Sequence, residues 1–223
     1  MVNEQEEAKR ASSLLFTILN LFYSEGMGLK KFYIMFIVLL VLGIASGIFY
    51  LKVIRPGNAE LPEDVVMETA HGNEFTFTDL PKKARLIEFM YTNCPDVCPM
   101  TTLKMSKLRN DLEKEGVFGD EVEFITVTID PEHDTKAVLQ DYAERFQVTS
   151  DDEGWVFLRG SEKDTEKLAD SLDFLYRDPG TGEIIHSTFA YFLDENNNLL
   201  EKFPMGEGFD KDKVYTRIMN TIK

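Results

Sequence analysis

The sequence predicts an α/β domain with a mixed β-sheet flanked by helices, preceded by one N-terminal transmembrane helix. Between residues 65 and 175, segments with the apolar pattern of strands alternate with segments whose apolar residues recur every three or four positions. This alternation is typical of a parallel sheet with right-handed crossovers. Nearer the C-terminus, two strand patterns flank the turn-rich sequence DENNN, which predicts a β-hairpin and so adds antiparallel pairing to the sheet.

The individual elements follow from local composition. Predicted strands are apolar runs rich in β-branched and aromatic residues, or alternate apolar with polar residues, whereas predicted helices show apolar residues at +3 and +4 spacing. In chain order we expect a strand at 73–80, a strand at 85–91, a helix ending at 115, a strand at 121–129, a helix at 135–146, a strand at 155–158, a helix at 162–175, strands at 189–193 and 199–203, and a helix at 210–222.

An uncharged apolar run of 20 residues, Phe32–Leu51, precedes the domain, and its length matches what a helix needs to cross a bilayer. A cleavable signal peptide is the alternative, but its apolar region would usually be only about 7 to 15 residues long. Lys30 and Lys31 precede the run and acidic residues follow it. The positive-inside rule therefore predicts a single-pass protein of the cell membrane, with 1–31 in the cytoplasm and the C-terminal domain on the outer face.

Residues 52–64 contain proline, glycine and charge without apolar periodicity, which predicts a tether, and we expect the folded domain to span 65–223. Translation could begin at Met1 or at Met27, and the sequence does not decide between them. From residue 55 onward, 35 Asp and Glu outnumber 19 Lys and Arg. This negative charge argues against nucleic acid as a partner. The outer location implies an oxidising compartment.

The two cysteines of the sequence lie in the segment YTNCPDVCPMTT, where Cys94 and Cys98 are spaced as CxxxC. A predicted strand leads into this segment and a predicted helix leads out of it, so the cysteines lie on a strand-to-helix turn. Pro95 and Pro99 fit this placement because proline is tolerated in the first turn of a helix, where backbone N–H groups lack intrahelical partners. The positive end of the helix dipole favours thiolate over thiol, so we expect a lowered cysteine pKa.

Two thiols at this spacing could share a metal ion, act as a redox pair, or form a structural disulfide. The structural disulfide is the weakest of these explanations, because a bridge across three residues closes a very small loop and restrains little of the unfolded chain. The metal explanation requires a third ligand, since two thiolates alone make a poor site for an ion that must be held and still exchange.

Three histidines are available as the third ligand. His71 lies in a polar turn and His133 opens a helix, where a solvated side chain is the ordinary expectation. His186 lies in IIHST, directly before an apolar strand and after a loop with glycine and proline, and such a loop can bring a side chain to the end of another strand. Soft thiolates select Cu(I) and imidazole suits copper, so Cys94, Cys98 and His186 would make a copper site, whereas zinc would want a fourth ligand.

At these residues the sequence resembles the Sco/SenC family. The motifs that carry the resemblance are YTNCPDVCPMTT, Asp130-Pro131 at the end of a strand (TIDPEHDT), Trp155 at the start of the next strand (WVFLRG), and HST before an apolar strand. The resemblance covers residues 65 to 222 in motif order, and CPDVCP is its most specific part.

The resemblance implies a thioredoxin-like fold, attachment to a respiratory membrane, and binding of Cu(I) or Cu(II) through Cys94, Cys98 and His186. It also implies that Asp130 supports the ligands or the local structure. The implied function is a copper chaperone that assists assembly of the dinuclear copper A centre of cytochrome c oxidase, with oxidase subunit II or another copper-accepting protein as its partner. Many bacterial relatives are held by a lipidated cysteine, whereas this chain has no third cysteine, so the expected anchor is the transmembrane helix.

A thiol–disulfide oxidoreductase that keeps the oxidase subunit II cysteines reduced is the alternative function. In that case Cys94 attacks a substrate disulfide and Cys98 resolves it, which leaves a Cys94–Cys98 disulfide. Thioredoxins normally have CxxC and a facing cis-proline, whereas this sequence has CxxxC and no proline in STFAYFL. A peroxiredoxin-like peroxidase is weaker still, because no arginine is clearly placed beside Cys94. The sequence leaves open the oxidation state of the copper, the oligomeric state and whether the protein is an enzyme.

Overall fold

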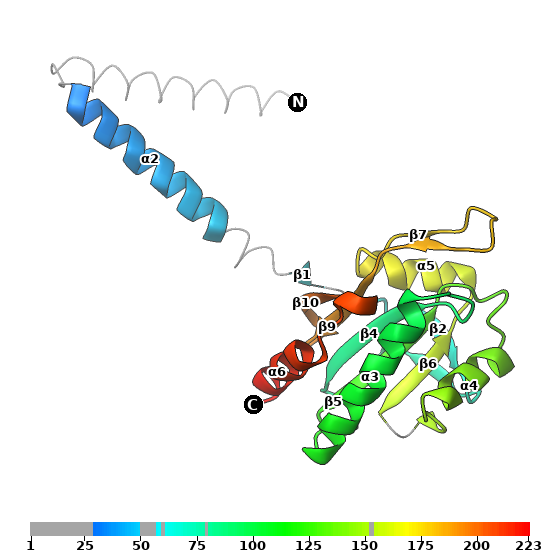
Figure 1. The fold of residues 1–223 in the computed structure, drawn as a ribbon. Coiled ribbons are helices and arrows are strands. Elements are labelled where there is room, and N and C mark those ends of the chain that lie inside the picture. Colours follow the sequence, from blue (N-terminus) through cyan, green and yellow to red (C-terminus); the bar gives the residue numbers. More distant parts are fainter. Residues whose placement is uncertain (1–28, 50–56, 59–60, 79, 152–153) are drawn as a thin grey trace. The chain divides into compact units, whose positions relative to one another are not determined.

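A computed structural model describes residues 29–49, 57–58, 61–78, 80–151 and 154–223 (Figure 1). The chain divides into two compact units, Met1–Arg55 and Pro56–Lys223. Most of the predicted cytoplasmic segment 1–31, including Met27, lies outside the described residues, and so does much of the predicted tether 52–64.

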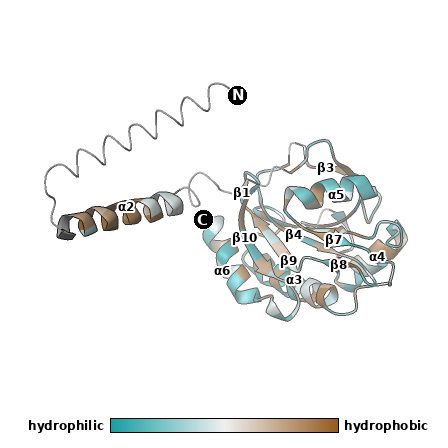
Figure 2. Ribbon diagram, turned by 90° about the horizontal axis from the view of Figure 1, so that it is seen from above, coloured by the Kyte–Doolittle hydropathy of each residue, from teal (hydrophilic) through white to brown (hydrophobic). Residues whose placement is uncertain are grey.

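Helix α2, Leu29–Phe49, is the described part of the first unit and covers most of the predicted transmembrane run. Figure 2 colours much of this helix as hydrophobic, and all its large apolar side chains from Phe32 to Ile44 except Met35 are exposed. Among the described residues, no helix is long and apolar enough to cross a membrane. The transmembrane anchor and its orientation therefore stay predictions.

The second unit is built on a mixed sheet, as the sequence predicts. Its strands lie in the order β1-β10-β9-β4-β5-β6-β2-β3. The pairs β4–β5 and β5–β6 are parallel, whereas β9, β10, β1, β2 and β3 join the sheet by antiparallel pairing. The strands are β1 Gly57–Asn58, β2 Val66–Thr69, β3 Glu74–Thr76, β4 Ala84–Met90, β5 Val122–Thr128, β6 Trp155–Arg159, β9 Phe189–Leu193 and β10 Asn198–Pro204.

Helices cover both faces of this sheet. Figures 1 and 2 place α3 and α6 on one face and α5 on the opposite face, while α4 adjoins α3 through a contact between the Thr102 and Tyr142 hydroxyls. A separate hairpin, β7 Tyr176–Arg177 and β8 Ile185–His186, follows α5. The helices are α3 Val97–Lys114, α4 Lys136–Arg145, α5 Glu162–Ser171, η3 Gly206–Gly208 and α6 Lys211–Thr221.

Strand β4 lies at the centre of the core, and every residue from Ala84 to Met90 is buried. A strand covered on both faces has no need to alternate apolar with polar residues, which explains the nearly continuous apolar sequence of this segment. Arg85 is buried here because Glu123 and the Asn197 side chain satisfy its guanidinium at 2.6 and 2.7 Å. These contacts tie the amino-terminal ends of β4 and β5 together. At the carboxyl ends, Met90 pairs with Thr128, and both strands lead from there into the loops that form the site.

Helix α5 ends at Ser171, so the predicted helix at 162–175 is too long. The Asp173 backbone has a positive φ of 54°, its N–H donates to the Asp170 carbonyl, and the Phe174 N–H donates to the Ala169 carbonyl. These bonds make a Schellman ending, in which glycine is the usual residue with positive φ. Because aspartate takes that position here, the sequence lacks the glycine that usually marks the C-terminus of a helix. Phe174 leaves the helix and is buried in the core.

The folded unit begins earlier than the sequence predicts. Strand β1 lies within the predicted tether 52–64 and pairs with β10, and the compact unit starts at Pro56. Strands β1, β7 and β8 have two residues each, which is too short for a periodicity to appear in the sequence. The strand expected at 73–80 is shorter than predicted, because the structure has only Glu74–Thr76 in β3.

Candidate metal centre

The loop between β4 and α3 carries Cys94 and leads to Cys98 at the start of α3, at the edge of the sheet. Asp134, which is buried, accepts the Thr92 N–H at 3.0 Å and also accepts the hydroxyls of Thr92 and Thr128. The Cys94 N–H then donates to the Tyr91 carbonyl at 3.1 Å. One carboxylate thus ties the end of β4 to the end of β5 and determines where the cysteine loop leaves the sheet.

Cys98 lies in the first turn of α3, which begins at Val97, as the proline pattern predicts. Its backbone N–H donates to the Sγ atom of Cys94 at 3.4 Å. An N–H at the positive end of a helix stabilises negative charge on the sulfur that it faces. Cys98 is buried and Cys94 is half-buried, and the two sulfurs are not bridged.

His186 joins the cysteine pair from the β7–β8 hairpin. Its Nε2 atom lies 4.0 Å from the Sγ atom of Cys98, and a ligand atom from each of the three side chains lies within 4.8 Å of the others. Its Nδ1 atom lies 2.7 Å from the Ser187 carbonyl oxygen. A carbonyl accepts hydrogen bonds, so Nδ1 carries a hydrogen and Nε2 is the nitrogen available to a metal. The part of the chain that the structure describes has no second cluster of three such ligands.

Two aromatic rings hold the imidazole in place. The Phe174 ring lies nearly parallel to that of His186, with centroids 6.0 Å apart and an interplanar angle of 23°. Tyr91 meets the imidazole edge-on at 5.9 Å. Phe174 itself stacks on Phe89 of β4, with centroids 4.4 Å apart. The hydrophobic core therefore fixes the orientation of a side chain that a short peripheral hairpin supplies.

The two thiols share one negative charge unequally. The hydrogen bond that Cys98 donates lowers the pKa of Cys94 to about 4, and His186 and two backbone N–H groups add to this effect against the cost of burial. The same bond, together with burial, raises the pKa of Cys98 well above its usual range. The lowered pKa expected from the helix dipole is thus right for Cys94 and wrong for Cys98. At neutral pH the pair holds a thiolate at Cys94 and a thiol at Cys98.

The pKa of His186 is raised. Burial alone would lower it, but the hydrogen bonds to Cys94 and to the Ser187 carbonyl, together with the negative charge of Cys94, outweigh burial. A metal ion must therefore compete with a proton for Nε2. The negative charge of Cys94, which attracts this proton, also attracts the metal ion.

Glu88 is a fully buried carboxyl group of β4 that faces α3. It accepts hydrogen bonds from the hydroxyls of Thr102 at 3.3 Å and Thr126 at 3.4 Å. No described lysine or arginine forms an ion pair with it. Burial raises the pKa of Glu88 to about 8, against the opposing effect of the two threonine hydrogen bonds. At neutral pH this side chain is therefore mostly the neutral acid.

The structure separates the other sequence candidates from the Cys94, Cys98 and His186 cluster. Asp130 Oδ1 pairs with Nδ1 of His133 at 2.8 Å, and His71 pairs with Asp151 at 2.8 Å. No described hydrogen bond joins Asp130 to either cysteine or to His186, so its supporting role stays a prediction. Neither of the two other histidines joins the cluster.

Sequence reasoning missed three residues that shape the site. Asp134 shares an acidic segment with Asp130, and the sequence alone does not say which of the two reaches the cysteine loop. Phe174 was hidden inside the overlong predicted helix. Glu88 did give a signal, because it is a lone acid in the middle of the apolar strand segment RLIEFMY, and a charged residue that a strand buries on both faces needs an explanation.

Replacement of Glu88 by glutamine tests its protonation through the pH dependence of stability. The folded-state pKa is raised from 4.5 to about 8, so the unfolded chain releases this proton at a lower pH than the folded protein does. The wild type therefore loses several kcal/mol of unfolding free energy through this group as the pH rises from about 4.5 to 8. Glutamine cannot ionise, so its unfolding free energy lacks this pH dependence. Urea denaturation at pH 5 and pH 8.5, values chosen about this window, should show that the unfolding free energy of the variant relative to the wild type is higher at pH 8.5 than at pH 5.

The matched control for this test is Glu195→Gln, which changes an exposed acid in the turn before β10. Its stability difference from the wild type should be the same at both pH values. A Glu88→Gln difference that is also constant with pH would contradict a neutral buried acid.

Comparison with known proteins identifies relatives of this arrangement. A SCO1/SenC family lipoprotein from Bacillus anthracis aligns with a TM-score of 0.64 and 26% identity over 71% of this chain and 92% of its own. Copper-bound yeast Sco1 aligns with a TM-score of 0.59 and 25% identity over 71% and 86%. BsSco, described as a member of the Sco family of cytochrome c oxidase assembly proteins with a disulfide switch, aligns with a TM-score of 0.64 and 24% identity over 75% and 96%.

These alignments confirm the thioredoxin-like α/β fold with a mixed sheet that the sequence resemblance implies. The family model for SCO1/SenC matches residues 57–223, a range that includes both cysteines, His186 and the whole described sheet. Because this match covers well over half of the sequence, the chain belongs to the SCO1/SenC family.

Proposed function

We propose that this protein binds copper through Cys94, Cys98 and His186 and passes it to a copper-accepting partner. The observation that supports this proposal best is the convergence of two sulfurs and one imidazole nitrogen within 4.8 Å of one another. Thiolates select Cu(I), and imidazole suits copper in both common oxidation states. Zinc favours four ligands, and no fourth Cys, His, Asp or Glu joins this cluster among the described residues.

The same three side chains suit a site that must release its cargo. Cys94 and His186 are half-buried, so a partner thiolate can reach the metal from the solvent side, while Cys98 is buried behind them. Cys94 is already ionised at neutral pH, whereas Cys98 must give up a proton when copper binds. Copper uptake therefore releases protons, and a lower pH favours copper release.

The proposed destination of the copper is the dinuclear copper A centre of cytochrome c oxidase, with oxidase subunit II as the accepting partner. Membership of the SCO1/SenC family supports this assignment. BsSco is described as a cytochrome c oxidase assembly protein, and yeast Sco1 has been solved with copper bound.

Thiol–disulfide exchange is the second candidate, and the asymmetry of the cysteine pair favours it. Cys94 combines a lowered pKa with partial exposure, which suits an attacking thiolate, while Cys98 keeps its proton and suits the resolving thiol. Cys94 would break the disulfide of oxidase subunit II to form a mixed disulfide. Attack by Cys98 would then release the second partner thiol and leave a Cys94–Cys98 disulfide, which an external thiol reductant must reduce before the next reaction.

The proposed location is the outer face of the cell membrane, with the run 32–51 as the anchor and 1–31 in the cytoplasm. The run carries no charge over 20 residues, and most of it forms the continuous helix α2 with exposed apolar side chains. Lys30 and Lys31 on its N-terminal side favour this orientation. The Bacillus anthracis relative is a lipoprotein, which reaches a membrane by another route.

Copper titration tests the proposed ligands. The reduced full-length protein in nonionic detergent should bind one Cu(I), measured by competition with a chromophoric chelator. Cys94→Ser, Cys98→Ser and His186→Ala should each weaken binding by roughly a hundredfold or more, because each removes one of three ligands. His133→Ala is the matched control and should bind copper like the parent. Absence of copper uptake by the reduced protein, or parental affinity in His186→Ala, would refute the proposal.

A disulfide substrate distinguishes the two candidate functions. A copper chaperone should reduce an added model disulfide once per molecule and then stop, and its transfer of Cu(I) should depend on His186. An oxidoreductase should sustain turnover when a thiol reductant is supplied. The measurement is product thiol released over time by the wild type and by His186→Ala. Sustained turnover that is undiminished in His186→Ala would favour the oxidoreductase over the chaperone.

Vesicle flotation tests the anchor. We expect the full chain to float with lipid vesicles and to resist extraction at alkaline pH, because a spanning helix inserts almost irreversibly. A version that begins at Pro56 should stay in the soluble fraction. Flotation of this shortened version, or release of the full chain at alkaline pH, would argue against the anchor.

A further inference from the structure

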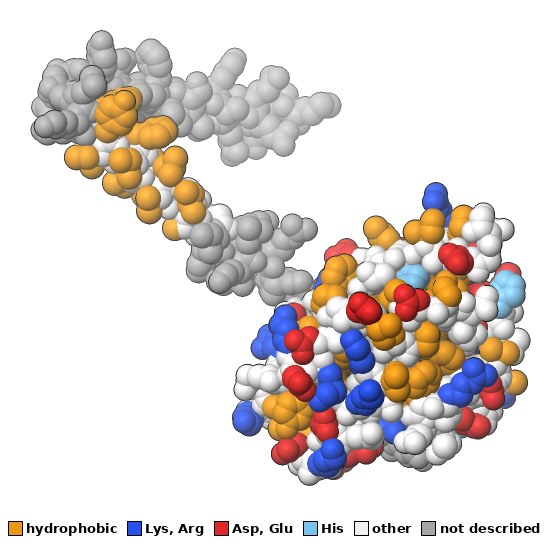
Figure 3. Space-filling view, viewed as in Figure 1, with side chains coloured by type: hydrophobic (Ala, Val, Ile, Leu, Met, Phe, Trp, Pro, Cys, Tyr) orange, Lys and Arg blue, Asp and Glu red, His pale blue; other side chains and the backbone are white. Residues whose placement is uncertain are grey.

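The elements that position the proposed copper ligands also expose apolar side chains. In the described part of the second unit, six large apolar side chains are exposed, and four of them are Leu103 on α3, Leu175 and Ile185 at the β7–β8 hairpin, and Phe189 at the start of β9. Leu175 is 72% exposed and Ile185 is 57% exposed. Figure 3 shows apolar surface gathered over the hairpin and α3. Exposed apolar surface beside a functional site is typical of a binding face.

The hairpin holds these side chains in fixed positions. The Leu175 N–H donates to the Ser187 hydroxyl at 3.1 Å, and the Ser187 N–H donates to the Leu175 carbonyl at 2.8 Å. Tyr176 pairs with His186 in the same ladder. Leu175 and Ile185 are therefore held in a constant relation to His186, and a partner would meet a preformed surface at little entropic cost.

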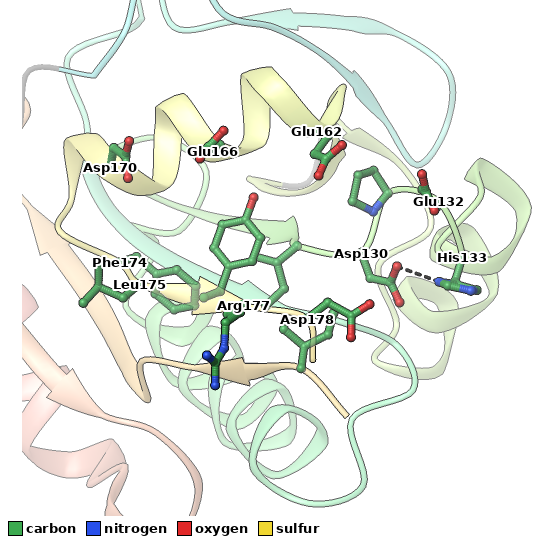
Figure 4. A pocket seen from close by; sticks show the side chains of 14 residues that line it. Asp130, Glu132, His133, Glu162, Glu166, Asp170, Phe174, Leu175, Arg177 and Asp178 are labelled. Atoms are coloured by element: carbon green, nitrogen blue, oxygen red, sulfur yellow. Dashed lines mark hydrogen bonds and ion pairs between the residues drawn. The ribbon is translucent and has the colours of Figure 1, made fainter. Parts of the chain in front are cut away.

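An acidic cleft of about 460 Å³ adjoins this apolar surface. Phe174 connects the two regions, because it lines the cleft and stacks on His186. Figure 4 shows the α5 carboxylates on one side of the cleft and Asp130, Asp178 and Arg177 on the other. The carboxylates that line it are Asp130, Glu132, Glu162, Glu166, Asp170 and Asp178.

The cleft is electrostatically unbalanced. Glu162, Glu166 and Asp170 follow one another every four residues along α5, and none of them forms a described ion pair, while Arg177 and His133 are the basic residues of the lining. Burial and then these three carboxylates raise the pKa of Tyr176 to about 12. Cu(I) held by two thiolates and a neutral imidazole would add a further net negative charge beside the cleft. The face as a whole therefore favours a positively charged partner.

We propose that the copper-exchanging partner is a protein that docks on Leu175, Ile185 and Phe189 through an apolar patch bordered by lysine or arginine, with one basic side chain entering the acidic cleft. This inference rests on the proposed copper function. In the exchange, copper stays Cu(I): its bonds to Cys94, Cys98 and His186 are replaced by bonds to the partner's thiolates, and protons lost by the partner's thiols return to Cys98 and His186.

The probes for this proposal are two synthetic dithiol peptides of equal length. Both carry CxxxC and the same leucines, but one is flanked by Lys and Arg and the other by Glu and Asp. The full chain in nonionic detergent is reduced, loaded with Cu(I) and mixed with each peptide in a stopped-flow instrument. We expect transfer to the basic peptide to be at least about tenfold faster at low ionic strength, with the difference shrinking as salt is added.

Two variants test the face itself. One variant removes three cleft charges, and the other removes two exposed apolar side chains. Each should slow copper transfer to the basic peptide several-fold, while its affinity for Cu(I) stays that of the parent. They are E162Q/E166Q/D170N and L175S/I185S. The matched controls make the same kinds of change away from the site, three in the connection between α3 and β5 and two on β2 and α4, and should transfer copper like the parent. They are E115Q/D120N/E121Q and V66S/V138S.

A third peptide, the basic one with serine in place of cysteine, reports docking without copper by fluorescence anisotropy. Equal transfer to the basic and acidic peptides, or equal slowing in the variants and their controls, would overturn the proposed partner chemistry. Stronger inhibition by Mg²⁺ than by NaCl of equal ionic strength would assign the cleft to a divalent cation and also overturn it. Failure to load Cu(I) would instead count against the proposed function, while the anisotropy experiment would still test docking.

Discussion

The site depends on the packing of one aromatic ring, that of Phe174, between the sheet and an imidazole. The ring stacks on Phe89 of β4 on one side and on His186 on the other. The hairpin that supplies His186 has two residues in each strand, and so short a ladder does not fix a side chain by itself. The core supplies the missing rigidity. This is possible only because the helix ends with a positive φ at Asp173, which frees Phe174 from the helical path.

The cysteine pair is suited to two chemistries because its thiols differ in environment. The half-buried Cys94 faces a helix N–H and holds the charge, whereas the buried Cys98 keeps its proton. Thiol–disulfide exchange uses this asymmetry directly, because the Cys94 thiolate attacks while Cys98 keeps its proton until it resolves the mixed disulfide. Copper binding must abolish it, because both sulfurs have to be deprotonated. Ionised Glu88 would oppose the second deprotonation. Burial keeps Glu88 mostly neutral at physiological pH, against the opposing effect of the two threonine hydroxyls, so its charge does not disfavour metal binding.

Sequence patterns were sufficient for the features that depend on local order or on residue type. The apolar run of β4, the helix after the cysteines and the final hairpin all follow from periodicity. Cys94, Cys98 and His186 are candidates because the chain has only two cysteines and three histidines. The rest depends on contacts distant in sequence. Nothing local shows that Asp134 will reach Thr92 across 42 positions, and a helix ending built on aspartate instead of glycine looks like continued helix.

The position of the acidic cleft beside the ligands, and not around them, has a consequence for how a partner would approach. If both proteins are held at one membrane surface, they meet at high effective concentration, and long-range attraction adds less to the frequency of encounter. Orientation then becomes the limiting factor, because the partner's thiolates must face the half-buried Cys94 and His186. A charge contact in the off-centre cleft together with an apolar contact at Leu175 and Ile185 makes two points of attachment. Two points remove the freedom to rotate that a single central contact would leave.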